Sequence, residues 1–208
     1  SLGFTMDKFE LFFTAVIILS IFVGSLFATV QTDMKRLIAY SGVVQSGFIL
    51  SGITSGVNGT SASLFYLAAY VIQLTGIFLI FSAITGELSS DFSMDNLSGL
   101  FVENKFITIC FSIFMLGLAG LPLTSGFISK FILITNLWSY EKYILVFALM
   151  LSTVAGFYFY LKPIWVAAID KPDAVVSKIT LKLNDKISIG MLAGITILLG
   201  LFPNILIN

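Results

Sequence analysis

Uncharged stretches divide the first half of this chain into segments long enough to cross a lipid bilayer. Leu11–Val30 carries no charge, and about 20 apolar residues span the hydrocarbon core as a helix. Leu37–Gly86 is also uncharged and is too long for a single crossing. The Gly, Ser and Asn content of Ser51–Ser63 predicts a loop. This leaves crossings at Leu37–Leu50, or slightly beyond, and at Leu64–Thr85.

The second half of the chain shows the same alternation. The acidic segment Gly86–Asn104 predicts an aqueous loop, and the apolar run Phe106–Tyr140 predicts a fourth crossing. Two further crossings are predicted at Tyr143–Leu161 and Ile187–Ile207, with the mixed-charge loop Asp170–Lys186 between them. The pattern therefore predicts an all-α membrane protein with six transmembrane helices.

The fourth predicted crossing, Phe106–Tyr140, is too long for one straight helix. It has about 35 residues, whereas a simple span needs about 20. Pro122 cannot donate a hydrogen bond to the Leu118 carbonyl, and its ring clashes there. We therefore expect the helix to break at Gly120–Pro122 and to continue as a second half.

Lys130 is the only charged residue within that run. Charges inside a membrane are costly and usually mark proton or ion pathways. Gly126 lies one turn earlier on the same face, which leaves room for a neighbouring helix, water or a polar partner. Because desolvation disfavours the charged form of a lysine, we expect Lys130 to carry protons in a hydrated channel. The alternatives are a lysine that extends to the interface and a structural ion pair.

Other polar residues are candidates for the same pathway. Lys162 lies among aromatic residues near the end of a crossing and is either an interfacial anchor or a channel exit. The turn Gln31–Arg36, which contains Lys35, either fixes the topology or takes up protons. Within the crossings, the residues that either hold helices together or contact channel water are Gln45, Ser46, Gln73 and Thr75.

Composition supports the membrane class and limits the chemistry. Hydrophobic residues are 58% and charged residues 11% of the chain, against about 25% charged residues in soluble domains, and the mean hydropathy is +1.04. The sequence has no histidine and a single cysteine, Cys110, so it allows no internal disulfide or Fe–S site. It contains no phosphate-binding glycine loop and no nucleophile elbow. The net charge of zero gives no reason to expect nucleic acid as a partner. We expect no metal site, no cofactor site and no covalent catalysis in this chain.

Basic residues gather on one side of the six predicted crossings. That side has Lys35, Arg36, Lys105, Lys162, Lys171, Lys178, Lys182 and Lys186. The other side has Lys8 and Lys142. Since lysine and arginine favour the cytoplasmic side, we expect the Lys35–Arg36 turn in the cytoplasm and the C-terminus outside. The start at Ser1, without an initiator methionine, suggests a part of a longer polypeptide.

Two stretches resemble motifs of one family. Gln31–Phe48, which reads QTDMKRLIAYSGVVQSGF, resembles a signature of the antiporter-like subunits of respiratory complex I. Gly117–Phe131, which reads GLAGLPLTSGFISKF, resembles the broken helix twelve of the same subunits. Phe65–Ile80 and Asp95–Leu100 look like the subunit N branch of that family, and the resemblance covers nearly the whole chain.

This resemblance implies a place within a fourteen-helix fold that contains two inverted five-helix repeats. The chain then corresponds to helices nine to fourteen in a single transmembrane domain, residues 1–208. The second repeat would lie at about 8–169 and the closing helix at about 187–207. Lys130 matches the family's helix-twelve lysine, which is proposed to pass protons outward. Lys35 matches a lysine at the cytoplasmic turn, and Lys162 falls where relatives often have a basic residue.

The resemblance also implies a function, that of the C-terminal half of subunit N in a proton-translocating NADH:quinone oxidoreductase. Such a subunit is a multi-pass protein of the bacterial inner (plasma) membrane and holds no redox cofactor. NADH, FMN, Fe–S clusters and quinone would be bound by partner subunits. Its neighbours would be other membrane subunits, the quinone-reducing module and lipid. The alternatives are a subunit of a cation/proton antiporter or of a membrane-bound hydrogenase, and a purely structural membrane subunit.

Overall fold

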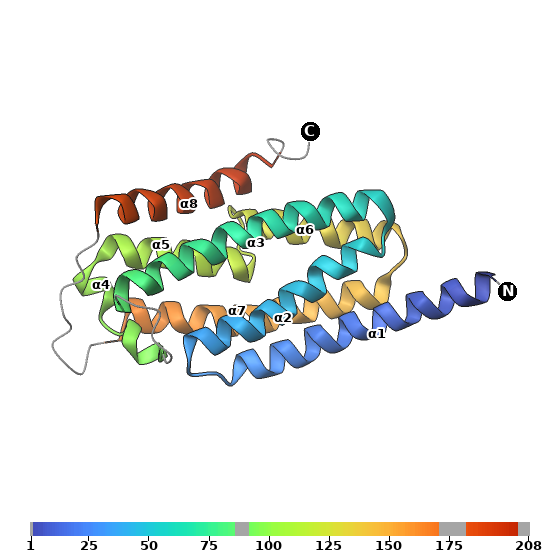
Figure 1. Cartoon of the computed structure of the whole chain (residues 1–208), viewed down its shortest axis with the longest axis horizontal. Coiled ribbons are helices and arrows are strands. Elements are labelled where there is room, and N and C mark those ends of the chain that lie inside the picture. The colour runs from blue at the N-terminus through green and yellow to red at the C-terminus, as the bar shows by residue number, and fades with distance from the viewer. Residues whose placement is uncertain (1, 86–91, 171–181, 204–208) are drawn as a thin grey trace.

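The computed structural model describes residues 2–85, 92–170 and 182–203, and this part of the chain is helical with short connections (Figure 1). The longer helices are α1 (Leu2–Thr29), α2 (Met34–Ile53), α3 (Gly56–Thr85), α5 (Lys105–Ala119), α6 (Ser125–Ser139), α7 (Tyr143–Ala168) and α8 (Leu183–Leu201). Two short helices, η1 (Met94–Leu97) and α4 (Leu100–Glu103), lie between α3 and α5.

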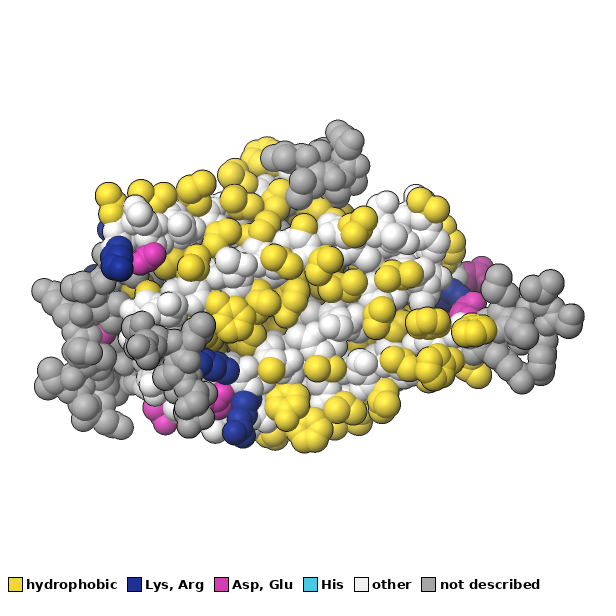
Figure 2. Space-filling model, in the orientation of Figure 1, with side chains coloured by type: hydrophobic (Ala, Val, Ile, Leu, Met, Phe, Trp, Pro, Cys, Tyr) yellow, Lys and Arg dark blue, Asp and Glu magenta, His cyan; other side chains and the backbone are white. Residues whose placement is uncertain are grey.

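The surface of the bundle is that of a membrane protein. Hydrophobic side chains cover the length of the visible face, whereas charged side chains gather at the two ends (Figure 2). Within the described residues, four helical segments are long and apolar enough to cross a membrane: Phe9–Thr29, Gly56–Ile84, Tyr143–Ala168 and Leu183–Leu201. We call the end at which α1 meets α2 the basic end, because Lys35 and Arg36 lie there.

Two hydrophobic clusters hold the helices together. In the larger one, Phe111 and Phe114 of α5 are fully buried together with Ile77 and Phe81 of α3. The smaller one joins α1, α2, α3, α6 and α7 around residues such as Leu133. Lys130 lies on α6 and lines a small cavity together with residues of α2, α3 and α5. The clusters therefore fix the helices that surround the lysine.

The prediction of a loop at Ser51–Ser63 is wrong. Helix α2 continues to Ile53 and α3 begins at Gly56, so the connection is only two residues long. A Cβ added to Gly59 would lie 2.2 Å from the Gly52 carbonyl oxygen, and Ser63 Oγ donates to the Ile49 carbonyl at 2.8 Å. Small residues serve here as a close helix–helix contact. Serine hydroxyls that bond to backbone carbonyls satisfy the polar groups that this contact buries.

The prediction of an aqueous loop at Gly86–Asn104 is wrong for residues 92–104, the part of this segment that the structure describes. Phe92, Met94 and Leu97 are buried in the larger cluster. Asp33 caps α2 and also accepts a hydrogen bond from the Phe92 N–H at 3.0 Å. The polar turn before α2 is therefore bonded to this segment, which the sequence pattern did not indicate. Glu87 and Asp91 lie outside the described residues.

Two helix ends also differ from their predicted positions. Helix α7 continues to Ala168, seven residues beyond the predicted end at Leu161, with Pro163 inside it. Pro163 and Ala167 are buried, and this packing offsets the hydrogen bond that a proline removes. Helix α8 ends at Leu201, earlier than predicted, and residues 204–208 lie outside the described part of the chain.

The α2–α3 contact gives a test with a matched control. Gly59→Ala should lower the free energy of unfolding by about 1–3 kcal/mol, because the added methyl overlaps the Gly52 carbonyl. Gly194→Ala on α8 should be neutral or slightly stabilising, since a Cβ there meets nothing within 4 Å. Thermal unfolding in detergent, followed by tryptophan fluorescence, measures both. Equal stability of the two variants would contradict the close contact.

Glu103, at the end of α4, gives a second test. Both of its carboxylate oxygens are buried and accept no hydrogen bond within the described residues. Burial raises the pKa of Glu103 above its ordinary value of 4.5, so the folded state favours the neutral carboxyl. Stability should therefore be highest below that ordinary value and fall as the pH rises through the raised pKa.

Glu103→Gln should accordingly raise the thermal midpoint at pH 7 and leave it unchanged at pH values below the ordinary carboxyl pKa. Glu141→Gln, at an exposed position, is the control and should leave the midpoint unchanged at both pH values. If the Glu103→Gln variant has the same thermal midpoint as the parent at pH 7, the ionised Glu103 carboxylate does not destabilise the folded state, which would contradict this prediction.

Candidate functional site

A glycine turn separates α5 from α6 at the predicted break. Gly120 has a left-handed φ of 86°, and its N–H bonds to the Leu116 and Gly117 carbonyls at 3.0 Å. The Leu121 N–H also bonds to Leu116 at 3.0 Å, which completes a Schellman motif. Pro122 follows and cannot continue the helix. The break therefore lies where it was predicted, at Gly120–Pro122, and it begins with the left-handed Gly120.

Lys130 bonds to the end of the helix that this turn terminates. Its Nζ donates to the Leu118 and Ala119 carbonyls, at 3.0 Å each. The last four carbonyls of a helix have no partner within it, and this end carries partial negative charge. The Nζ also lies 5.1 Å from the centre of the Phe48 ring, close enough for a cation–π contact.

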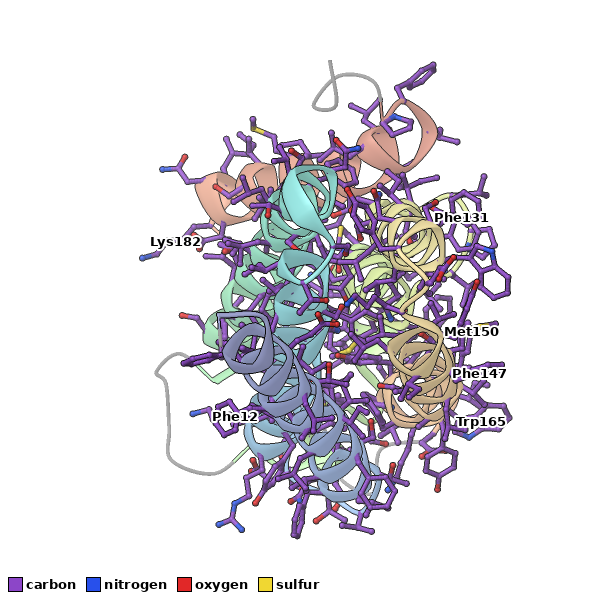
Figure 3. All side chains as sticks on the ribbon, turned by 90° about the vertical axis from the view of Figure 1, so that its right-hand side faces the viewer. Phe12, Phe131, Phe147, Met150, Trp165 and Lys182 are labelled. Atoms are coloured by element: carbon purple, nitrogen blue, oxygen red, sulfur yellow. The ribbon has the colours of Figure 1, made fainter. Side chains whose placement is uncertain are left out.

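The lysine is buried but has no carboxylate partner within the described residues. Its side chain is 6% exposed, and the ion pair found in the described part of the chain joins Lys142 to Glu10 at the end opposite the basic end. Phe131, the next residue on α6, points outward (Figure 3) and is 56% exposed. Lys130 therefore faces the bundle interior, and backbone dipoles provide the balancing charge.

Glycines let the backbone and the lysine approach this closely. A Cβ on Gly126 would lie 1.8 Å from the Gly117 carbonyl oxygen. A Cβ on Gly120 would lie 2.9 Å from Cδ of Lys130, and one on Gly117 would lie 2.7 Å from Nε2 of Gln73. The Gly117 carbonyl lies on the side of Gly126 where the sequence predicts room for a neighbour.

A small cavity lies beside Lys130. Its volume is about 10 Å³, close to the minimum that one water molecule needs. The polar side chains that line it come from α2, α3 and α6 and are Gln45, Tyr66, Tyr70, Gln73, Ser129 and Lys130. The structure thus gives the lysine one polar face in an otherwise apolar bundle.

Hydrogen bonds link two predicted polar residues of this site to residues that the sequence reasoning missed. Gln45 Nε2 donates to the Tyr160 hydroxyl at 3.0 Å, and the Tyr66 hydroxyl donates to Gln45 Oε1. Gln73 Nε2 donates to Ser125 Oγ at 3.0 Å. Tyr66 precedes Gln73 by seven residues, so both lie on the same face of α3. This spacing is a signal that could have found Tyr66.

The remaining predicted residues lie apart from the cavity. Ser46 and Thr75 are exposed in this chain, and each hydroxyl donates to a carbonyl four residues earlier in its own helix. Lys35 lies in the first turn of α2, at the basic end, and Lys162 lies near the end of α7. Their proposed roles as channel residues stay predictions.

Comparisons with known proteins agree with this architecture. The family model described as "NADH:quinone oxidoreductase/Mrp antiporter, TM" matches residues 2–156. The chain is 38% identical, over 170 residues, to "NAD(P)H-quinone oxidoreductase subunit 2" of Prochlorococcus marinus (strain AS9601), covering 80% of this chain and 33% of that protein. It is 34% identical, over 167 residues, to the chloroplastic subunit 2 of Chlorokybus atmophyticus, covering 80% and 32%. The chain thus spans about a third of the length of these relatives.

Solved structures show the same fold. A chain of respiratory complex I from Thermus thermophilus with bound aureothin is 24% identical, with a TM-score of 0.84 over 94% of this chain and 44% of that one. A chain of the Mrp complex from Dietzia sp. DQ12-45-1b is 20% identical, with a TM-score of 0.84 over 96% and 46%. Since the family model matches well over half of the residues, the sequence-based identification is confirmed: this chain belongs to the family of antiporter-like membrane subunits shared by NADH:quinone oxidoreductases and Mrp antiporters.

Proposed function

We propose that this chain is the proton-carrying part of an N-type subunit in a proton-translocating NAD(P)H:quinone oxidoreductase, with Lys130 as the proton carrier. The observation that carries the proposal is the state of Lys130, a buried lysine that bonds to carbonyls at a helix break and has no carboxylate partner within the described residues. The names of the relatives, NAD(P)H-quinone oxidoreductase subunit 2, support the class of complex.

The geometry of Lys130 suits reversible loss of a proton. An ammonium group has three N–H donors, and two of them are used by the Leu118 and Ala119 carbonyls. The third is left for the cavity. A neutral amine keeps two N–H groups, so Lys130 can release its third proton into the cavity without breaking either carbonyl bond. Partner subunits that carry the redox centres would bias this equilibrium through a change between two states.

The same proposal covers the place of the chain in the family fold. Helices α1, α2, α3, the broken pair α5–α6, α7 and α8 would form six crossings, equivalent to helices nine to fourteen. The basic end would face the cytoplasm of a bacterial inner membrane, because basic residues gather there. NADH, FMN, Fe–S clusters and quinone would be bound by other subunits, and Lys35 and Lys162 would lie at the channel's cytoplasmic side.

A cation/proton antiporter subunit is the second candidate, since an Mrp complex has a chain of the same fold. The two candidates share the lysine and differ in their partners. Purification of the native complex separates them: quinone-reducing subunits with Fe–S clusters support the oxidoreductase, and their absence from an active complex supports the antiporter.

The six-crossing topology predicts where the C-terminus lies. A reporter enzyme that is active only on the outer side of the membrane should be active when it is fused after Asn208. Six crossings place both ends of the chain on the side away from the basic end. The same reporter inserted between Lys171 and Lys178 should report the cytoplasm. A cytoplasmic signal from the Asn208 fusion would contradict the six-crossing topology.

Lys130 itself is the most direct target. Lys130→Ala should lower proton translocation by the reconstituted complex by about 100-fold or more, the range expected for loss of a proton-transfer group. Lys130→Arg should also impair it, because arginine keeps the charge and does not release its proton. Lys105→Ala, at an exposed position, is the control and should translocate normally. Full proton translocation by Lys130→Ala would refute the proposal.

A further inference from the structure

Three side chains next to the cavity, Tyr66, Gln45 and Tyr160, form a hydrogen-bond chain in which both donors point the same way. The Tyr66 hydroxyl donates to Gln45 Oε1, and Gln45 Nε2 donates to the Tyr160 hydroxyl. Gln45 thus holds both tyrosines, Tyr66 through its carbonyl oxygen and Tyr160 through its amide nitrogen.

This direction determines what Tyr66 presents to the cavity. A tyrosine hydroxyl has one proton and can also accept. The proton of Tyr66 is used on Gln45, so only its lone pairs remain. Gln73 also offers an acceptor, because its Nε2 donates to Ser125 Oγ and its Oε1 is left to accept a hydrogen bond. Both residues line the cavity with Lys130, so each presents an acceptor there.

We propose that Gln45 is a positioning residue for Lys130: through Tyr66 and Tyr160 it fixes an acceptor-only hydroxyl, which orients a single water between Tyr66 and the lysine. This inference rests on the proposed function of Lys130. The water accepts the third N–H of Lys130 and donates its two protons to Tyr66 Oη and Gln73 Oε1. These three bonds are the usual number for a buried water.

The cavity size agrees with one such water. Its volume of about 10 Å³ leaves no room for a second molecule. A water held by two acceptors turns its lone pairs toward Lys130 and favours the charged lysine, which has only donors. A chain of aligned hydrogen bonds also strengthens each member. Tyr160 therefore acts on the lysine without touching it.

No other charged group within the described residues competes for this role. The titratable side chains that line the cavity with Lys130 are Tyr66 and Tyr70, both from α3. Helix α2 contributes Gln45 and the Phe48 ring, and α5 contributes backbone carbonyls. Helix α7 reaches the site through Tyr160, and α8 meets the break with Gly200, which packs on the Leu123 backbone. The acceptor that Tyr66 presents to the cavity therefore depends on its bond to Gln45.

The pH profile of proton translocation by the intact complex in proteoliposomes tests the proposal. Tyr66→Phe removes the acceptor, disfavours the charged lysine and should move the alkaline limb of the profile to lower pH by about 1 unit, the shift that loss of one hydrogen bond produces. Gln45→Leu should move it in the same direction, because Tyr66 is then free to donate into the cavity. A structural role alone would lower the rate at every pH without moving the limb.

Tyr158→Phe is the matched control, since Tyr158 lies two residues from Tyr160 on α7 but is 58% exposed. Its profile should equal that of the parent. An unmoved limb in Tyr66→Phe, in a complex in which Lys130→Ala is impaired, overturns the positioning role and leaves the function of Lys130 standing. Normal translocation by Lys130→Ala overturns both.

Discussion

A buried ammonium group that is balanced by backbone carbonyls is the constraint on which the rest of this structure depends. Taking a charge out of water costs several kcal/mol, and within the described residues no carboxylate compensates Lys130. The two carbonyls that do so, Leu118 and Ala119, are available only because α5 ends beside them. A continuous helix would use both carbonyls in its own hydrogen bonds. The break and the lysine are therefore one feature.

Small residues make that arrangement possible. Gly120 supplies the left-handed turn that ends α5, and Gly126 allows α6 to press against the Gly117 carbonyl. Around this backbone, neutral polar groups on α2 and α3 line the remaining face. The site thus surrounds one titratable cation with dipoles, which can respond to a change in its charge without a competing ion pair. This is the physical basis of the proposal that Lys130 carries protons and is not part of a fixed structural salt bridge.

Much of this arrangement could be predicted from the sequence. A lone lysine in a long apolar run, with Gly and Pro eight to ten residues before it, predicts both a broken helix and an intramembrane site. The Ser51–Ser63 segment misled the prediction because small residues that mark loops in water also allow helices to pack closely. Tyr66, Tyr160 and the Asp33–Phe92 bond were missed, since each depends on a partner far away in the sequence.

As a proton carrier, Lys130 would exchange its proton with water inside the bundle. A high-resolution structure of the membrane-embedded complex, with ordered waters resolved, is the direct test. We expect a water within hydrogen-bond distance of Lys130 Nζ, in the cavity beside Tyr66 and Gln73, with the Leu118 and Ala119 contacts kept. A dry site in which a carboxylate of a neighbouring subunit contacts Lys130 would contradict it and make the lysine a structural ion pair.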